Sequence, residues 1–182
     1  PVEPFRPRVS IKSETGETLL DWEVTALELR HDTNFRDSNT GDMIDAAYIF
    51  YFRTDKTEDN FGIDGLIGTP MFRLPDAYVG RDNFDLTEDT ECKWAFNFNN
   101  SNLSRYSTGY GCNNSWMKQC PNEATLTVKK NDKEWEFTFT MLDYGMFGYT
   151  EQGTKNVLTI EWKGPATKYT GSQKNDMTDA DY

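Results

Sequence analysis

The chain has 182 residues, of which 30 are Asp or Glu and 19 are Lys or Arg, so its formal net charge at pH 7 is −11. A surface of this sign repels phosphate groups, and the longest basic run is Lys129-Lys130, which excludes binding to nucleic acids and to anionic membrane surfaces. No stretch approaches the roughly 18 consecutive apolar residues of a membrane-spanning helix. The length is that of one domain with a sizeable core.

The chain starts with a polar segment rich in proline, and residues 1–8 are expected to form a tether in front of the folded domain. Because the sequence has no initiator Met, we expect that a targeting segment was removed or that the sequence was trimmed. The tether is followed by residues 9–12, which predict a short strand at a sheet edge.

Two further strands are predicted in the first third of the chain. In residues 19–30 the apolar side chains share one face up to Ala26, whereas Leu27 and Leu29 fall on the other, which indicates a β-bulge near Ala26. Residues 46–52 are almost continuously apolar. A strand that is covered on both faces has this composition, so we expect it at the centre of the sheet.

The last third of the chain predicts a three-stranded antiparallel meander over residues 124–170. Large apolar side chains occupy every second position on both sides of a polar turn at residues 131–133, which is the period of a half-buried strand. These residues are Leu126, Val128, Trp135, Phe137, Phe139, Met141, Leu158, Ile160 and Trp162. Residues 92–98 alternate in the same way and predict one more strand.

The pattern as a whole predicts an all-β protein. Antiparallel strands with turns rich in Gly, Pro and Asn indicate a jelly-roll-like β-sandwich of about 8 to 11 strands. A lipocalin-like closed barrel is the alternative, and it would enclose a ligand where the sandwich fills its interior with side chains. We expect a single β-sandwich domain over residues 9–171 and a loose acidic tail over residues 172–182, which shows no apolar period.

A long loop over residues 99–119 is the first candidate binding site. Aromatic rings stack on the C–H faces of sugars and Asn amides hydrogen-bond hydroxyl groups, so the loop suits recognition of a glycan or a protein. The candidate residues are Tyr106, Tyr110, Trp116, Asn113 and Asn114. The alternative is that the aromatic side chains fold back and cap an open end of the core.

The cysteines of this loop predict a local disulfide in an oxidising compartment. Cys112 and Cys120 lie on either side of a segment rich in Asn and Ser, and Cys92 would remain a free thiol. The alternative is three reduced thiols.

A calcium ion is the one cofactor that the sequence suggests. Asp55, Thr57, Asp59 and Asp64 offer oxygen ligands at the spacing of a calcium loop, but the EF-hand pattern fails, since Leu66 stands where a bidentate Glu is needed. The alternative is a solvated acidic turn.

The sequence gives no sign of catalysis. His31 is the single histidine, and no Gly-x-Ser-x-Gly elbow is present, so we expect a protein that is not an enzyme.

Two segments of the meander, residues 124–139 and 158–166, resemble the closing strands of small β-sandwich lipoproteins of gut Bacteroidetes. In both, a Thr/Val strand, a polar turn and an aromatic strand lead to a strand that ends in aromatic-x-Gly-Pro, here Trp162-Lys163-Gly164-Pro165. The resemblance implies export, a lipid anchor on an N-terminal cysteine lost from this sequence, and a periplasmic or cell-surface location. It carries no catalytic residues over to this chain.

These observations lead to one expected function and two alternatives. The expected function is that of a non-enzymatic exported protein that recognises a glycan or a protein partner at the bacterial cell surface. The first alternative is a structural or accessory subunit that docks by β-augmentation, through a strand edge or the proline-rich segment. The second alternative is a lipocalin-like carrier of an apolar small molecule.

Overall fold

The computed structural model describes residues 2, 4–34, 45–58, 68–88, 94–99, 107–111, 123–143 and 155–182. The all-β antiparallel class is confirmed by the strands in these residues, and the predicted meander is β8, β9 and β10. The strands are β1 (Arg8–Lys12), β2 (Thr18–Asp32), β3 (Ala47–Thr54), β4 (Met71–Pro75), β5 (Arg81–Asp85), β6 (Ala95–Asn99), β7 (Ser107–Gly111), β8 (Ala124–Asn131), β9 (Glu134–Asp143) and β10 (Asn156–Lys168). Three short 3₁₀ helices are η1 (Asp76–Tyr78), η2 (Leu86–Glu88) and η3 (Asp179–Asp181).

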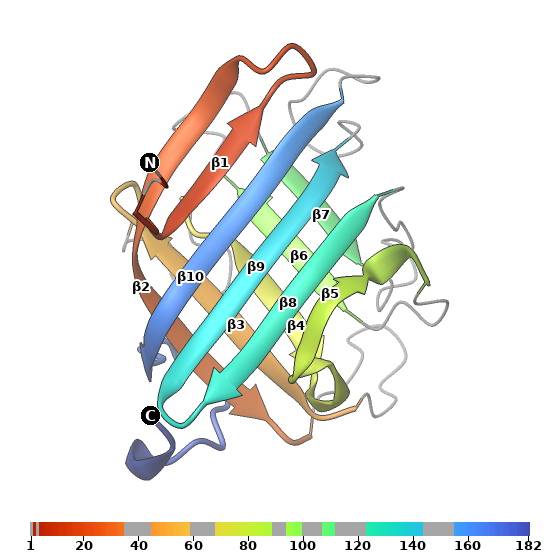
Figure 1. The fold of residues 1–182 in the computed structure, drawn as a ribbon. Coiled ribbons are helices and arrows are strands. Elements are labelled where there is room, and N and C mark those ends of the chain that lie inside the picture. Colours follow the sequence, from red (N-terminus) through yellow and green to blue (C-terminus); the bar gives the residue numbers. More distant parts are fainter. Residues whose placement is uncertain are drawn as a thin grey trace.

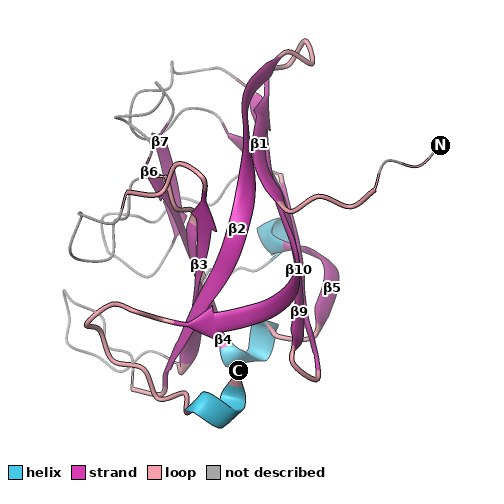
Figure 2. Cartoon of the chain, turned by 90° about the vertical axis from the view of Figure 1, so that its left-hand side faces the viewer, coloured by secondary structure: helices cyan, strands magenta, loops and turns pink. Residues whose placement is uncertain are grey.

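The strands are hydrogen-bonded in the order β5-β8-β9-β10-β1-β2-β3-β4-β6-β7 and form two layers that pack face to face (Figures 1 and 2). The front layer holds β5, β8, β9, β10 and β1, and the rear layer holds β3, β4, β6 and β7, whose strands cross those of the front layer in Figure 1. Among the described strands no pairing joins β5 to β7, so the sheet is not closed there. Most neighbours are consecutive in sequence, and this order does not confirm the finer jelly-roll-like description.

Strand β2 belongs to both layers. Its first half pairs with β1 and its second half with β3, and the register shifts between Val24 and Ala26. The predicted bulge near Ala26 is therefore confirmed. It returns Leu27 and Leu29 to the inner face, where both are fully buried.

The prediction that residues 9–12 form an edge strand was wrong. In β1, Val9 pairs with Ile160 of β10 on one side and with Trp22 of β2 on the other. The strand is short because Pro7, which precedes it, has no N–H to donate to a ladder. Beyond the point where β1 begins, β10 and β2 approach one another and pair in parallel over Ala166–Lys168.

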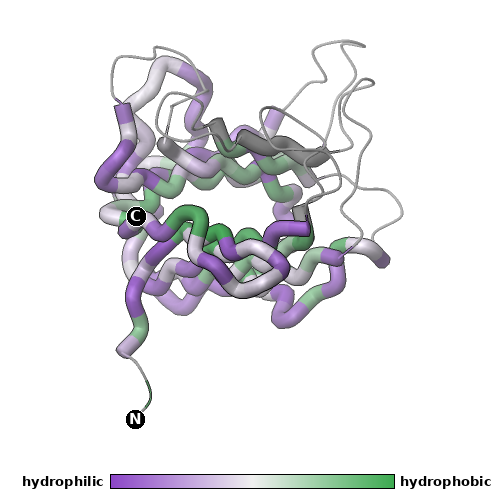
Figure 3. The backbone as a smooth tube through the Cα atoms, turned by 90° about the horizontal axis from the view of Figure 1, so that it is seen from above, coloured by the Kyte–Doolittle hydropathy of each residue, from purple (hydrophilic) through white to green (hydrophobic). Residues whose placement is uncertain are grey.

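Aromatic side chains from the two layers fill the space between them. Phe50 of β3 lies 5.4 Å from Trp135 of β9, measured between ring centroids, and Phe72 of β4 lies 4.6 Å from Phe139 of β9. All four are buried, and Figure 3 shows hydrophobic stretches in both layers. The interior of the described part is thus packed with rings.

Strand β3 is covered on both faces, as residues 46–52 predict. Phe50 and Phe52 point into the core, while Ile49 and Tyr51 alternate with them and are also buried. In a two-layer fold the outer face of a strand needs a further cover. Residues 169–182, which follow β10, supply part of it, because Tyr169 stacks on Tyr51 with ring centroids 4.9 Å apart.

Candidate functional site

The second half of β2 and the chain after β10 form the most developed polar site in the described residues. We call residues 169–182 the strap. The backbone N–H of Tyr169 donates to the carbonyl of Leu29 at 3.3 Å, and that of Asp176 donates to the carbonyl of His31 at 2.8 Å. The strap therefore leaves the edge of β2 where β10 ends, at Leu29, and returns to it two residues later, at His31, so the strap residues between these two bonds loop away from the edge.

The structure differs here from the expectation of a loose tail over residues 172–182. The strap has no apolar period, and none of its residues is fully buried. It is held in place because its polar groups are partners for the backbone and the charged side chains of β2, which the next contacts show.

Arg30 of β2 is the centre of the site. Its side chain points away from the core but is only 4% exposed. Its Nε donates to the hydroxyl of Tyr51 at 3.0 Å, and its two Nη atoms donate to the carbonyl of Lys174 at 3.1 Å and to the Oε1 atom of Gln173 at 2.6 Å. A buried guanidinium needs such partners, and two of these three belong to the strap.

Glu28, two residues before Arg30, also has one set of partners in the sheet and another in the strap. It is 5% exposed, and its Oε2 atom accepts a hydrogen bond from Nη1 of Arg53 at 2.5 Å. Its Oε1 atom accepts from the backbone N–H of Thr170 at 3.0 Å and from the hydroxyl of Thr170 at 2.8 Å. One oxygen of a buried carboxylate is thus bound within the sheet and the other by the strap.

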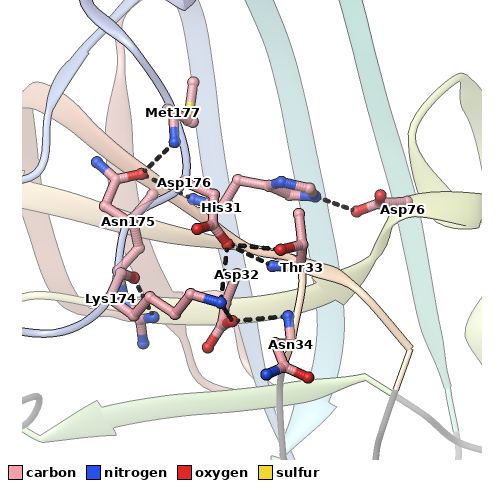
Figure 4. Close-up of polar contacts among 10 residues, drawn as sticks. His31, Asp32, Thr33, Asn34, Asp76, Lys174, Asn175, Asp176 and Met177 are labelled. Atoms are coloured by element: carbon pink, nitrogen blue, oxygen red, sulfur yellow. Dashed lines mark hydrogen bonds and ion pairs between the residues drawn. The ribbon is translucent and has the colours of Figure 1, made fainter.

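At the far end of the site the strap contacts the last residues of β2 and the turn after it (Figure 4). The Oδ1 atom of Asn175 accepts from the backbone N–H of His31 at 3.2 Å and from that of Met177 at 3.0 Å. The Oδ2 atom of Asp176 accepts from the backbone N–H and the hydroxyl of Thr33, both at 2.8 Å. These bonds from Thr33 hold the pKa of the Asp176 carboxyl below its usual value.

Opposite charges align along the same contact. The Nζ atom of Lys174 lies 3.5 Å from Oδ1 of Asp32 and 3.3 Å from Oδ2 of Asp176. Lys174 therefore bridges one carboxylate of β2 and one of the strap, as Figure 4 shows.

The side chain of His31 is engaged on the other side of β2. Its Nε2 atom lies 2.7 Å from Oδ1 of Asp76, and its ring centroid lies 4.3 Å from that of Tyr48. Burial, with a smaller contribution from Asp76, raises the pKa of Tyr48. These contacts join the end of β2 to η1 and to β3.

Tyr182 secures the end of the strap. Its hydroxyl donates to the carbonyl of Leu29 and accepts from Nδ2 of Asn175 at 2.9 Å. The side chains of Tyr182 and Met177 pack against the core. The strap is therefore anchored to β2 at its start, through Tyr169, and at its end.

The residues that the sequence predicts for recognition fall mostly outside the described part of the chain. Tyr106, Trp116, Asn113, Asn114 and the Cys112–Cys120 pair all lie there. Tyr110 lies in β7, where its backbone pairs opposite Phe96, but its side chain also lies outside the described part. These sites stay predictions.

Two of the four predicted calcium ligands lie in the described residues. Asp59 and Asp64 lie outside the described residues, whereas Asp55 and Thr57 lie within them. The hydroxyl of Thr57 accepts a hydrogen bond from the backbone N–H of Thr54 at 2.9 Å, and it lies 2.8 Å from the hydroxyl of Thr69. Thr57 therefore holds the turn together. Among the residues that the structure describes, no group of three or more His, Cys, Asp or Glu side chains is placed to hold a metal ion.

Two other surfaces bear on partner binding. The N-terminal arm projects from the sheet (Figure 2), with Val2 98% and Phe5 53% exposed, and Arg6 pairs with Asp21 at 2.6 Å. An open groove of about 900 Å³ lies between the arm and the front layer. Its lining residues are Val2, Pro4, Phe5, Arg6, Arg8 and Glu161.

The edge strand β5 is built to resist pairing with another chain. The register shifts between Arg81 and Phe84, and Asn83 has a positive φ of 50°. The guanidinium of Arg81 lies over the ring of Phe84 at 4.1 Å, and Asp82 binds Lys129 at 2.6 Å. A distorted and charged edge of this kind blocks β-augmentation.

Within the part of the chain that the structure describes, none of the helices has the length and apolar character needed to span a bilayer. Comparison with protein-family models, with curated proteins and with solved structures finds no match to this chain.

Proposed function

We propose that this protein is a non-enzymatic, exported binding protein whose partner is another protein, and that it holds a short segment of that partner against strand β2. The observation that carries the proposal is the contact between β2 and the strap. There, the chain binds a segment of its own through two backbone hydrogen bonds, to Leu29 and His31, and through strap side chains and carbonyls that contact the charged side chains and backbone of β2.

The chemistry of this contact favours a peptide over a sugar. The groups that β2 and the turn after it present to the strap include the carbonyls of Leu29 and His31 and the backbone N–H groups of His31 and Thr33. Main-chain donors and acceptors at a strand edge bind the main chain and amide side chains of a peptide. The glycan alternative depends on Tyr106 and Trp116, which lie outside the described residues.

The carrier alternative receives no support from the interior of the fold. A lipocalin-like carrier needs an empty space between its layers, whereas Phe52 and Phe137, from opposite layers, have ring centroids only 4.7 Å apart. Export and a cell-surface location rest on the resemblance of residues 124–139 and 158–166 to small lipoproteins.

A peptide library tests the proposal without knowledge of the partner. A random library displayed on phage is selected on the immobilised full chain and on its Asn175→Ala variant, in which three contacts of the strap are removed. We expect peptides to be enriched, and more strongly on the variant, whose own strap is held less firmly. If neither protein enriches peptides, or if soluble glycans displace the enriched peptides, the proposal is wrong.

A further inference from the structure

We propose that the strap is exchangeable between two copies of this chain, so that the β2 edge of one copy binds residues 169–182 of another. The inference rests on the proposed function and names its partner as a second copy. Three features of the described residues support it.

The first feature is that the strap is not itself a strand of the sheet. It follows the last strand, no strand pairing passes through it, and none of its residues is fully buried. Only two backbone hydrogen bonds, seven residues apart, join it to β2. Segments with few buried contacts open while the rest of a domain stays folded.

The second feature is what remains on β2 when the strap leaves. Arg30 keeps its bond to Tyr51 but loses the oxygen atoms of Gln173 and Lys174, and Glu28 keeps Arg53 but loses Thr170. With the strap absent, these side chains lose protein partners, and the strand edge exposes unpaired main-chain groups. The vacated edge therefore favours a replacement of the same chemistry.

The third feature is the specificity of the required occupant. It must offer a hydroxyl to Glu28, an amide oxygen to the N–H of His31, a carboxylate to Thr33 and a cation to Asp32. A second copy carries these groups at the required spacing, in Thr170, Asn175, Asp176 and Lys174. Lys174 of the second copy would also pair with Asp32 of β2, so the contact brings opposite charges together although the whole chain is acidic.

Exchange of this kind is reciprocal, because each copy gives a strap and receives one. Within one chain the effective concentration of the strap is in the millimolar range, so the closed single chain dominates at low protein concentration.

The first test uses the full chain and a fluorescein-labelled synthetic peptide of residues 169–182, with binding followed by fluorescence anisotropy. We expect the Asn175→Ala chain to bind the peptide at least about tenfold more tightly than the wild-type chain, whose own strap competes. A peptide with Asn175→Ala should bind about tenfold more weakly, and one with Asp179→Asn, a side chain that is 88% exposed, should bind unchanged. Absence of binding to both chains at about 1 mM peptide overturns the inference.

The second test follows the mass of the wild-type full chain by sedimentation velocity as its concentration is raised. Exchange forms the same contacts between two chains that the closed chain forms within one, so we expect dimers to appear as the protein concentration approaches the millimolar range. A chain that stays monomeric up to about 1 mM overturns the inference.

The two proposals fail in different ways. If library peptides are enriched but the strap peptide does not bind, exchange between copies is excluded and recognition of another protein stands. If neither the library nor the strap peptide binds, both proposals are wrong.

Discussion

Replacement of Asn175 by Ala tests whether side-chain hydrogen bonds hold the strap. The amide of Asn175 accepts from the N–H groups of His31 and Met177 and donates to the hydroxyl of Tyr182. Each such bond contributes about 0.5–1.5 kcal/mol net. Because the side chain is half-buried and water replaces part of what is lost, we expect the three together to contribute about 2 kcal/mol.

That free energy should appear as local opening of the strap. A loss of about 2 kcal/mol corresponds to a rise of about 30-fold in the population of the open strap. The backbone N–H of Asp176, which donates to the carbonyl of His31, reports this opening by amide hydrogen exchange. The matched control is Asp179→Asn in the same segment, where an exposed pair with Lys168 is lost and exchange should change by less than about threefold. Equal exchange of this N–H in the folded Asn175→Ala chain and the wild type would refute the reasoning.

Three further predictions concern the core, the strap and its pH dependence. Phe137→Ala removes a fully buried ring between the layers and should lower the free energy of unfolding by about 3–5 kcal/mol in urea titrations, with a smaller loss counting against a filled interior. Gly171→Ala places a methyl group 2.0 Å from the present position of the Tyr169 hydroxyl, so the ring must move and the near-UV circular dichroism of the stacked tyrosine should fall; an unchanged spectrum would contradict this packing. The hydrogen bonds from Thr33 lower the pKa of Asp176 when the strap is docked. The ionised carboxylate therefore stabilises docking above the pKa that Asp176 has in the unfolded chain, and this stabilisation is lost as the pH falls through the lower pKa of the docked state. Asp176→Asn should make the hydrogen exchange of the strap independent of pH over this range.

The sequence predicts the parts of the fold that repeat a short pattern. The meander is visible because Trp135, Phe137 and Phe139 alternate with polar residues, and the bulge near Ala26 is visible because the alternation shifts there. The position of β1 was predicted wrongly, since a short strand shows its own faces but not how many neighbours it has.

The strap could not be predicted from its own residues. A segment without apolar period has the composition of a loose tail, and its partners lie about 140 residues away in the sequence, as the pairs of Thr170 with Glu28 and of Asp176 with Thr33 show. An indirect signal that the strap would pack on the sheet lies in another part of the sequence. The continuous apolar run of residues 46–52 requires a cover on the outer face of β3, and two tyrosines, Tyr51 and Tyr169, form part of that cover.

The most direct test of the central claim, that the β2 edge accepts a peptide, is a titration followed by NMR. The ¹⁵N-labelled full chain with Asn175→Ala is titrated with unlabelled peptide of residues 169–182. We predict that the amide signals of His31 and Thr33, which donate to the strap, move toward their positions in the wild-type spectrum. Signals that stay in place up to about 1 mM peptide, or that move equally with a scrambled peptide, would contradict the account.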